Sequence, residues 1–197
     1  MKSNVCKIEN GTKDLAAILK ESEKVAVYND LDHKQTLHLR LICEEIDGLL
    51  PNLIDNFAGE FWIEFENGVC KVNVSLNFDM AKRSELVEVS TNKKNAAAVG
   101  IVGKIRASLE NIFLDEESVL AISAASNSYY FATEYHNCMS YSSFWTLEQY
   151  RNEVKADKDN GEKWDELEKS VLASVADDII VGLKGKQADI VIIKKFA

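Results

Sequence analysis

Residues 60–78, "EFWIEFENGVCKVNVSLNF", place two runs of alternating side chains on either side of Asn67-Gly68. An Asn-Gly pair favours a two-residue hairpin turn because both residues tolerate a positive φ. The apolar members of the two runs are Phe61, Ile63, Phe65, Cys70, Val72, Val74, Leu76 and Phe78. Since successive strand side chains point to opposite faces, this stretch predicts a half-buried antiparallel hairpin with one apolar face.

The segment before this hairpin has the periodicity of a long helix. From Gln35 to Ile54, leucines and isoleucines recur at steps of three and four, as one buried helical face requires. They are Leu39, Ile42, Ile46, Leu49 and Leu53. Pro51 interrupts this pattern, so a kink or a new helical turn is expected there.

Within that helix, Glu44 and Glu45 stand side by side in "LICEEIDGLL", residues 41–50. Adjacent helical residues are about 100° apart, so at most one of the two carboxylates lies near the apolar face. A partly buried glutamate would suit a general base, because burial raises its pKa towards the working pH. Two exposed glutamates on the polar side fit the same pattern, and the residues alone leave both interpretations open.

The remaining segments alternate between helices and strands. "NVCKIEN" (residues 4–10) predicts a first strand and "KDLAAILKESEKV" (13–25) a helix, while "IIVGLKGKQADIVIIKKF" (179–196) predicts a second hairpin turning at 184–187. Helices are also expected near 96–113 and 146–178, and strands at "VLAISAA" (119–125) and "YYFATEY" (129–135). This order predicts a single α+β domain over residues 1–197, a two-layer sandwich whose mixed, mostly antiparallel sheet is covered by helices on one face.

Composition excludes several classes of function. A net charge of −9 argues against a nucleic-acid surface, which needs clustered Lys and Arg. No run approaches the roughly 20 apolar residues of a membrane span, and the N-terminal segment lacks a secretion signal, so a cytoplasmic protein without a membrane partner is expected. The four cysteines lack the short spacings of a metal site, and Cys43 and Cys70 are predicted to be buried thiols.

Three stretches together resemble a known family. They are "LHLRLICEEIDGLL" (37–50), the hairpin after it, and "AVGIVGKIRASLE" (98–110). Their order is similar to the Bergerat-type ATP-binding fold of histidine-kinase catalytic domains, gyrase ATPase domains and serine-kinase anti-sigma factors, closest to the last group. The resemblance covers roughly residues 30–115, with 164–196 as the closing helix and hairpin and about 118–163 as an insertion.

The resemblance implies a set of site residues. Glu45 or Glu44 matches the catalytic glutamate, which in that family activates water or the phospho-acceptor hydroxyl. Asp79 matches the aspartate that contacts the adenine amino group. Gly100 and Gly103 match the glycines of the lid over the phosphates.

Two departures from the family's pattern bear on the chemistry. The asparagine that binds Mg²⁺ falls on Gly48 or Leu49, with Asn52 one turn later, and no glycines follow Asp79 in "NFDMAKRSE". The resemblance implies ATP, with Mg²⁺, as cofactor, but phosphoryl transfer needs the metal to neutralise developing charge. Weak or lost nucleotide binding is therefore predicted, and no metal site is assigned.

The favoured function is that of a bacterial-type regulatory protein acting through protein–protein interaction. The resemblance implies a partner such as a sigma factor or an anti-sigma antagonist, and it is compatible with a homodimer. One alternative is an active ATP-dependent protein serine kinase or ATPase in which Asn52 or Glu44 replaces the lost metal ligand. Another is an unrelated α+β binding module whose ligand meets the aromatic-rich segment 128–145.

Overall fold

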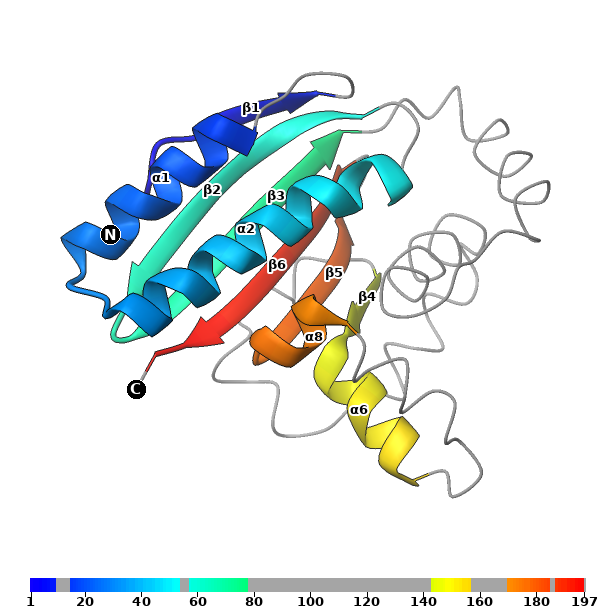
Figure 1. Cartoon of the computed structure of the whole chain (residues 1–197). Helices are drawn as coiled ribbons and strands as arrows, with labels where there is room; N and C mark the ends of the chain where they lie inside the picture. The colour runs from blue at the N-terminus through cyan, green and yellow to red at the C-terminus, as the bar shows by residue number, and fades with distance from the viewer. Residues whose placement is uncertain (10–14, 54–56, 78–142, 157–169, 185–186, 197) are drawn as a thin grey trace.

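The computed structural model describes residues 1–9, 15–53, 57–77, 143–156, 170–184 and 187–196 (Figure 1). The helices are α1 (Leu15–Tyr28), α2 (His33–Leu53), α6 (Leu147–Ala156) and α8 (Val171–Val175). The strands are β1 (Cys6–Glu9), β2 (Ala58–Glu66), β3 (Val69–Asn77), β4 (Ser143–Thr146), β5 (Asp178–Lys184) and β6 (Gln187–Lys195).

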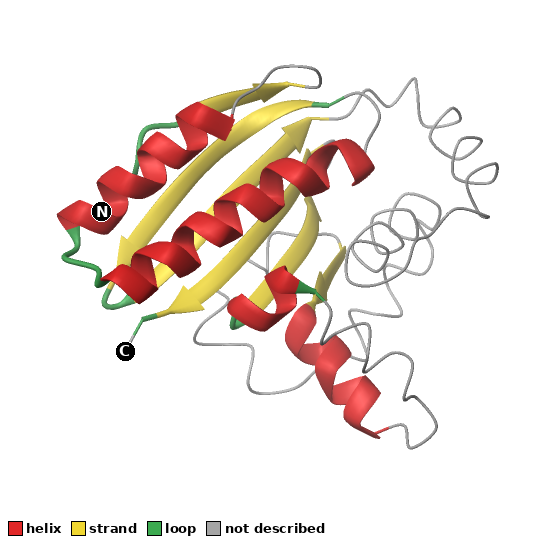
Figure 2. Cartoon of the chain, in the orientation of Figure 1, coloured by secondary structure: helices red, strands yellow, loops and turns green. Residues whose placement is uncertain are grey.

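The six strands form one open sheet in the order β1-β2-β3-β6-β5-β4. Every pair of neighbouring described strands is antiparallel. The described helices lie over one face of this sheet (Figure 2). The predicted α+β class with helices on one face is confirmed, and the expected parallel component does not occur among the described pairs.

Both predicted hairpins are confirmed. Glu66 pairs with Val69 across a two-residue turn in which Asn67 and Gly68 have φ values of 51° and 77°. The turn is held against the other hairpin, because the backbone N–H of Phe196 donates to the Gly68 carbonyl at 2.8 Å. β5 and β6 also pair as antiparallel neighbours, with Lys184 opposite Gln187.

The main core lies between the helices and the sheet. The described residues of the α2 stripe are all buried, with Leu39, Ile42 and Ile46 between 1% and 2% exposed and Leu49 6% exposed. They pack in one cluster with the helix-facing residues of the central strands, among them Phe61 and Ile192. The helix continues through Pro51 to Leu53 and ends there, so the proline stands in the last turn.

Two contacts join the C-terminal elements. The buried Asp178 carboxylate accepts hydrogen bonds from the Glu148 and Ile179 backbone N–H groups, both at 2.9 Å, and so satisfies one orphan donor at the start of α6. The Arg151 guanidinium donates to the Ala173 and Asp177 carbonyls at the end of α8. These contacts fix α6 and α8 beside β5.

Several predictions fall on other parts of the chain. The helix expected near 96–113 and the strands expected at 119–125 and 129–135 lie outside the described residues. The edge strand β4 was not predicted, although it lies in the aromatic-rich segment. In the described ranges, no helix combines the length and the apolar character needed to cross a membrane.

Candidate functional site

The first candidate site is the outer side of α2, where the predicted catalytic glutamates lie. Glu44 Oε1 accepts a hydrogen bond from Arg40 Nε at 2.8 Å, one helical turn earlier. Arg40 Nη1 also lies 3.9 Å from Glu23 Oε1 on α1. The Glu44 carboxylate therefore takes part in a surface ion-pair network that joins the two long helices.

Glu45 is exposed, and the buried positions beside the two glutamates are Cys43 and Ile46. Neither glutamate thus points into the core, as expected for the polar side of an amphipathic helix. Gly48 is also exposed, and a Cβ built at this position meets no atom within 4 Å. The space for a metal-binding asparagine exists on the helix, but the side chain is missing.

The other residues implied by the resemblance lie in parts of the chain that the structure does not describe. Asp79, Gly100 and Gly103 lie outside the described residues, and so does the side chain of Asn52. Among the residues that the structure does describe, no group of three or more His, Cys, Asp and Glu side chains is placed to hold a metal ion. The nucleotide site therefore stays a prediction.

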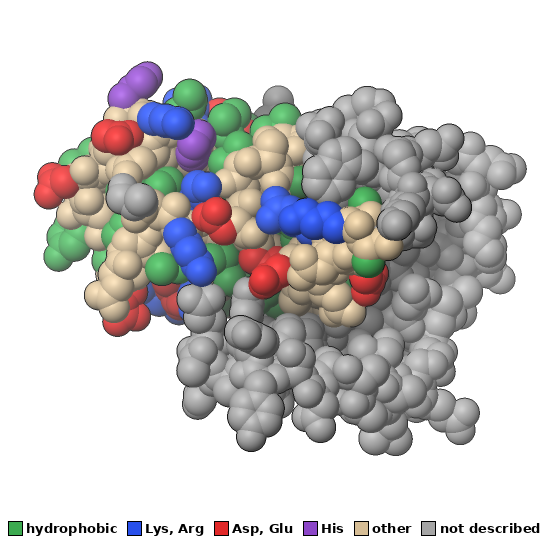
Figure 3. All heavy atoms as spheres, turned by 90° about the horizontal axis from the view of Figure 1, so that it is seen from below, with side chains coloured by type: hydrophobic (Ala, Val, Ile, Leu, Met, Phe, Trp, Pro, Cys, Tyr) green, Lys and Arg blue, Asp and Glu red, His purple; other side chains and the backbone are tan. Residues whose placement is uncertain are grey.

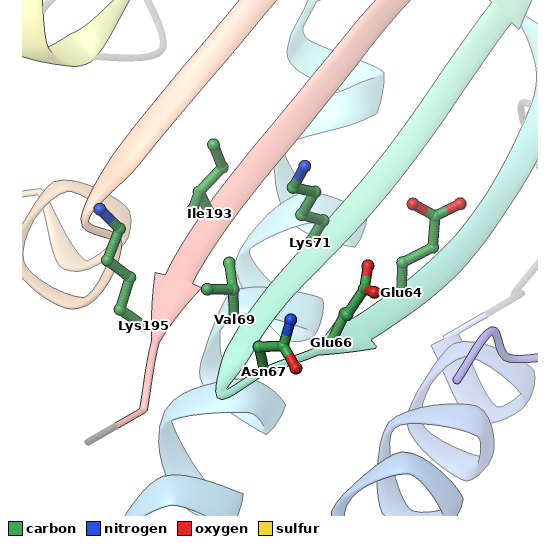
Figure 4. A pocket seen from close by; sticks show the side chains of 7 residues that line it. All are labelled: Glu64, Glu66, Asn67, Val69, Lys71, Ile193 and Lys195. Carbon is green, nitrogen blue, oxygen red and sulfur yellow. The ribbon is translucent and has the colours of Figure 1, made fainter. Parts of the chain in front are cut away.

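A second candidate site lies on the opposite face of the sheet, at the end formed by the first hairpin. It is a hollow of about 250 Å³ (Figure 4). Its lining comes from β2, β3, β6 and the turn between β2 and β3, and consists of Glu64, Glu66, Asn67, Val69, Lys71, Ile193 and Lys195. We call this feature the sheet hollow. The described surface seen in Figure 3 carries acidic and basic side chains interspersed.

Strand register explains how these seven residues meet. Val69 lies between Glu66 on β2 and Lys195 on β6 in one cross-strand row. Lys71 lies between Glu64 and Ile193 in the next row. Because these positions alternate with the core positions along each strand, they all point away from the helices.

The floor of the sheet hollow is apolar and separate from the main core. Ile193 is 8% exposed and Val69 is half-buried, and both belong to a second hydrophobic cluster that includes Ile180 and Val191. This cluster lies on the face away from α1 and α2. Both faces of β5 and β6 therefore carry buried apolar side chains.

Some charged side chains around the hollow already interact with other side chains of the protein, and others do not. Glu64 Oε1 accepts a hydrogen bond from Trp62 Nε1 at 2.9 Å and lies 3.6 Å from Lys2 Nζ. The same ammonium group sits 4.6 Å from the centroid of the Trp62 ring, a cation–π contact. Among the described residues, Glu66 and Lys71 form no ion pair, so their charges are available to a ligand.

Sequence reasoning missed this site, although a signal for it was present. The alternating pattern placed Glu64, Glu66 and Lys71 on a solvated face. In contrast, "DIVII" (189–193) is almost continuously apolar, which is typical of a strand buried on both faces. That run indicated that something beyond the helices contacts this side of the sheet.

No protein-family model, curated protein or solved structure matches this chain. The fold and the two surfaces define a class only. It is an α+β two-layer protein with an open antiparallel sheet, an ion-paired helix face on one side and an apolar, charge-rimmed hollow on the other.

Proposed function

We propose that this chain is a cytoplasmic regulatory protein, a divergent relative of the anti-sigma kinases, that acts by binding another protein. The observation that supports a binding role most strongly is the sheet hollow. A hollow with an apolar floor and a polar rim is the arrangement that protein-binding surfaces adopt. The partner class that follows from the resemblance is a sigma factor or an antagonist of an anti-sigma factor.

We propose further that nucleotide binding is weak or lost. The absence of a side chain at Gly48 supports this, since the resemblance implies a Mg²⁺-binding asparagine at or next to that position. The Arg40–Glu44 ion pair supports weak or lost nucleotide binding as well. Glu44 is one of the two candidate bases, and its carboxylate already pairs with Arg40 at 2.8 Å. If ATP is bound at all, Mg²⁺ would need other ligands.

A thermal denaturation experiment tests the nucleotide part. The midpoint is measured with and without millimolar Mg-ATP on the whole chain. A ligand at 100 times its dissociation constant adds about 2.7 kcal/mol to the free energy of unfolding. We expect a much smaller shift. A shift of that size would favour the alternative, an active ATP-dependent kinase or ATPase.

Cross-linking in cell extract tests the binding part. We expect a cross-linked partner that is captured by the wild-type chain and lost in Val69→Asp, which places a charge on the floor of the hollow. Leu37→Asp is the matched control, because Leu37 is a 45% exposed apolar residue on α2. Capture that is equal in all three chains, or absent from all, would contradict a partner at the sheet hollow.

A further inference from the structure

We propose that the sheet hollow receives an extended peptide segment of the partner that carries an acidic, an apolar and a basic side chain at alternate positions. This inference rests on the proposed function and specifies the chemistry of the partner. It depends on the size of the hollow, on the arrangement of its charges, and on which of those charges lack a partner.

The size of the hollow fits side chains rather than a whole cofactor. Its volume of about 250 Å³ falls below the roughly 300–1,000 Å³ of pockets for small molecules. The floor is formed by Val69 and Ile193, one residue from each of two neighbouring strands. One apolar side chain resting on this floor would cover both residues.

The rim of the hollow has two oppositely charged sides. Figure 4 shows Glu64 and Glu66 on β2 to one side of the floor and Lys195 on β6 to the other, with Lys71 on β3 between the two sides. The two carboxylates and two ammonium groups sum to zero charge. A uniformly acidic or uniformly basic ligand would be attracted at one side and repelled at the other, so the rim favours a ligand with both charges.

The spacing of an extended chain matches this arrangement. Neighbouring strands are about 4.8 Å apart, which places β2 and β6 about 10 Å from each other across β3. Alternate residues of an extended peptide are about 6.7 Å apart and point to the same side. When an apolar residue of the peptide lies over the floor, the peptide residues at i−2 and i+2 can reach the two sides of the rim, because long charged side chains are flexible.

Glu66 and Lys71 are the residues that would decide which partner binds. Glu64 already accepts from Trp62 and pairs with Lys2, so a ligand gains little by approaching it. Glu66 and Lys71 form no ion pair with described residues. Reversing either charge should therefore alter ligand preference without removing an ion pair that stabilises the fold.

The test uses a displayed library of random linear decapeptides, selected on the immobilised whole chain and counter-selected on Val69→Asp. We expect enrichment of peptides in which an acidic and a basic residue flank an apolar residue at i−2 and i+2. The affinity of one enriched peptide, measured by fluorescence anisotropy, should fall roughly fivefold in Lys71→Glu. The affinity of Lys71→Glu should recover when the acidic residue of the peptide is changed to lysine. The control variant Leu37→Asp should bind the original peptide as tightly as the wild-type chain does.

Several results would overturn the inference. The inference is wrong if the enriched peptides carry charges of one sign only or are purely apolar. It is also wrong if no peptide is enriched. If a cross-linked partner still depends on Val69 in those cases, the proposed function survives and only the peptide chemistry is wrong. Thermal midpoints of all variants are compared, and a further variant, Lys71→Gln, replaces Lys71→Glu if the latter does not fold.

Discussion

Replacing Glu21 by glutamine should destabilise the protein through the contact between the N-terminal segment and α1. Glu21 is 7% exposed although it is charged. Its carboxylate accepts hydrogen bonds from the Asn4 backbone N–H at 3.1 Å, from Asn4 Nδ2 at 3.2 Å and from Lys24 Nζ at 2.5 Å. A glutamine of the same shape would turn an amide NH₂ towards some of these donors.

The magnitude follows from those contacts. A hydrogen bond to a charged group contributes about 1.5–3 kcal/mol, whereas an ion pair with a side chain as exposed as Lys24 contributes under about 1 kcal/mol. The Asn4 contacts therefore dominate, and Glu21→Gln should lower the free energy of unfolding by about 2 kcal/mol. For a chain of 197 residues this corresponds to a fall of about 4–8 °C in the thermal midpoint.

The effect should also depend on pH in a defined direction. Burial alone would raise the pKa of Glu21, but the hydrogen bonds from Lys24 and Asn4 outweigh it and lower the pKa. A carboxylate with a lowered pKa stabilises the fold above its unfolded-state pKa, and this stabilisation is lost as the pH falls through the folded-state pKa. The difference between wild type and Glu21→Gln should be complete at pH 7 and shrink below about pH 4.5.

Urea denaturation at a series of pH values measures this difference. Glu23→Gln is the control, because Glu23 is on the same helix, is 62% exposed and lies 3.9 Å from Arg40. It should change the free energy of unfolding by less than about 0.5 kcal/mol. A Glu21→Gln effect as small as the control, or one that grows as the pH falls, would refute the argument.

Three further predictions concern other positions. Gly48→Ala should raise the free energy of unfolding by up to about 1 kcal/mol in urea denaturation, because the helical glycine has open space around it, and a loss of stability would contradict this. Gly68→Ala should lower the thermal midpoint, since the residue has a φ of 77° and a Cβ would lie 2.9 Å from the Phe196 carbonyl oxygen; an unchanged midpoint would show that the turn relaxes. Burial raises the pKa of the Cys43 thiol and raises that of Cys70 to about 12, so both should react with a thiol reagent only on unfolding, and mass-spectrometric labelling of the native chain at either cysteine would contradict this.

The sequence predicted those parts of the fold that depend on local pattern. Asn67-Gly68 fixed the first hairpin because few residue pairs adopt two positive φ values. The stripe from Leu39 to Leu49 determined the buried side of α2, because apolar residues at helical spacing all lie on one face of the helix. In both cases the information lies within about 20 residues of chain.

Features that depend on distant contacts were not predictable in the same way. Glu21 is a charged residue in the middle of α1, and its burial depends on hydrogen bonds from Asn4, which lies 17 positions away in the sequence. β4 has four residues, too few to show a period, and its pairing with β5 defines it. The sheet hollow needs the register of three strands, which alternation within one strand does not give.

The predicted nucleotide site illustrates a different limit. Its residues were assigned by likeness of motif, and the described part of the chain contains only its helix. There the Arg40–Glu44 pair is an ordinary i, i+4 interaction that any amphipathic helix can form. The motif on α2 therefore does not by itself indicate a nucleotide site. That conclusion would need residues such as Asp79 to be placed beside α2.

The position of β6 in the sheet has a consequence for how the protein is made. β6 pairs on one side with β3, and Ser75 reaches Asp189 across 114 positions of sequence. A ribosome adding about 5–20 residues per second needs roughly 6–23 s to synthesise that interval. Throughout this time the nascent hairpin of β2 and β3 presents an unpaired edge, which is a template for aggregation. Slower translation between residues 78 and 186 would lengthen that exposure, so the yield of folded protein should respond to codon choice in this interval.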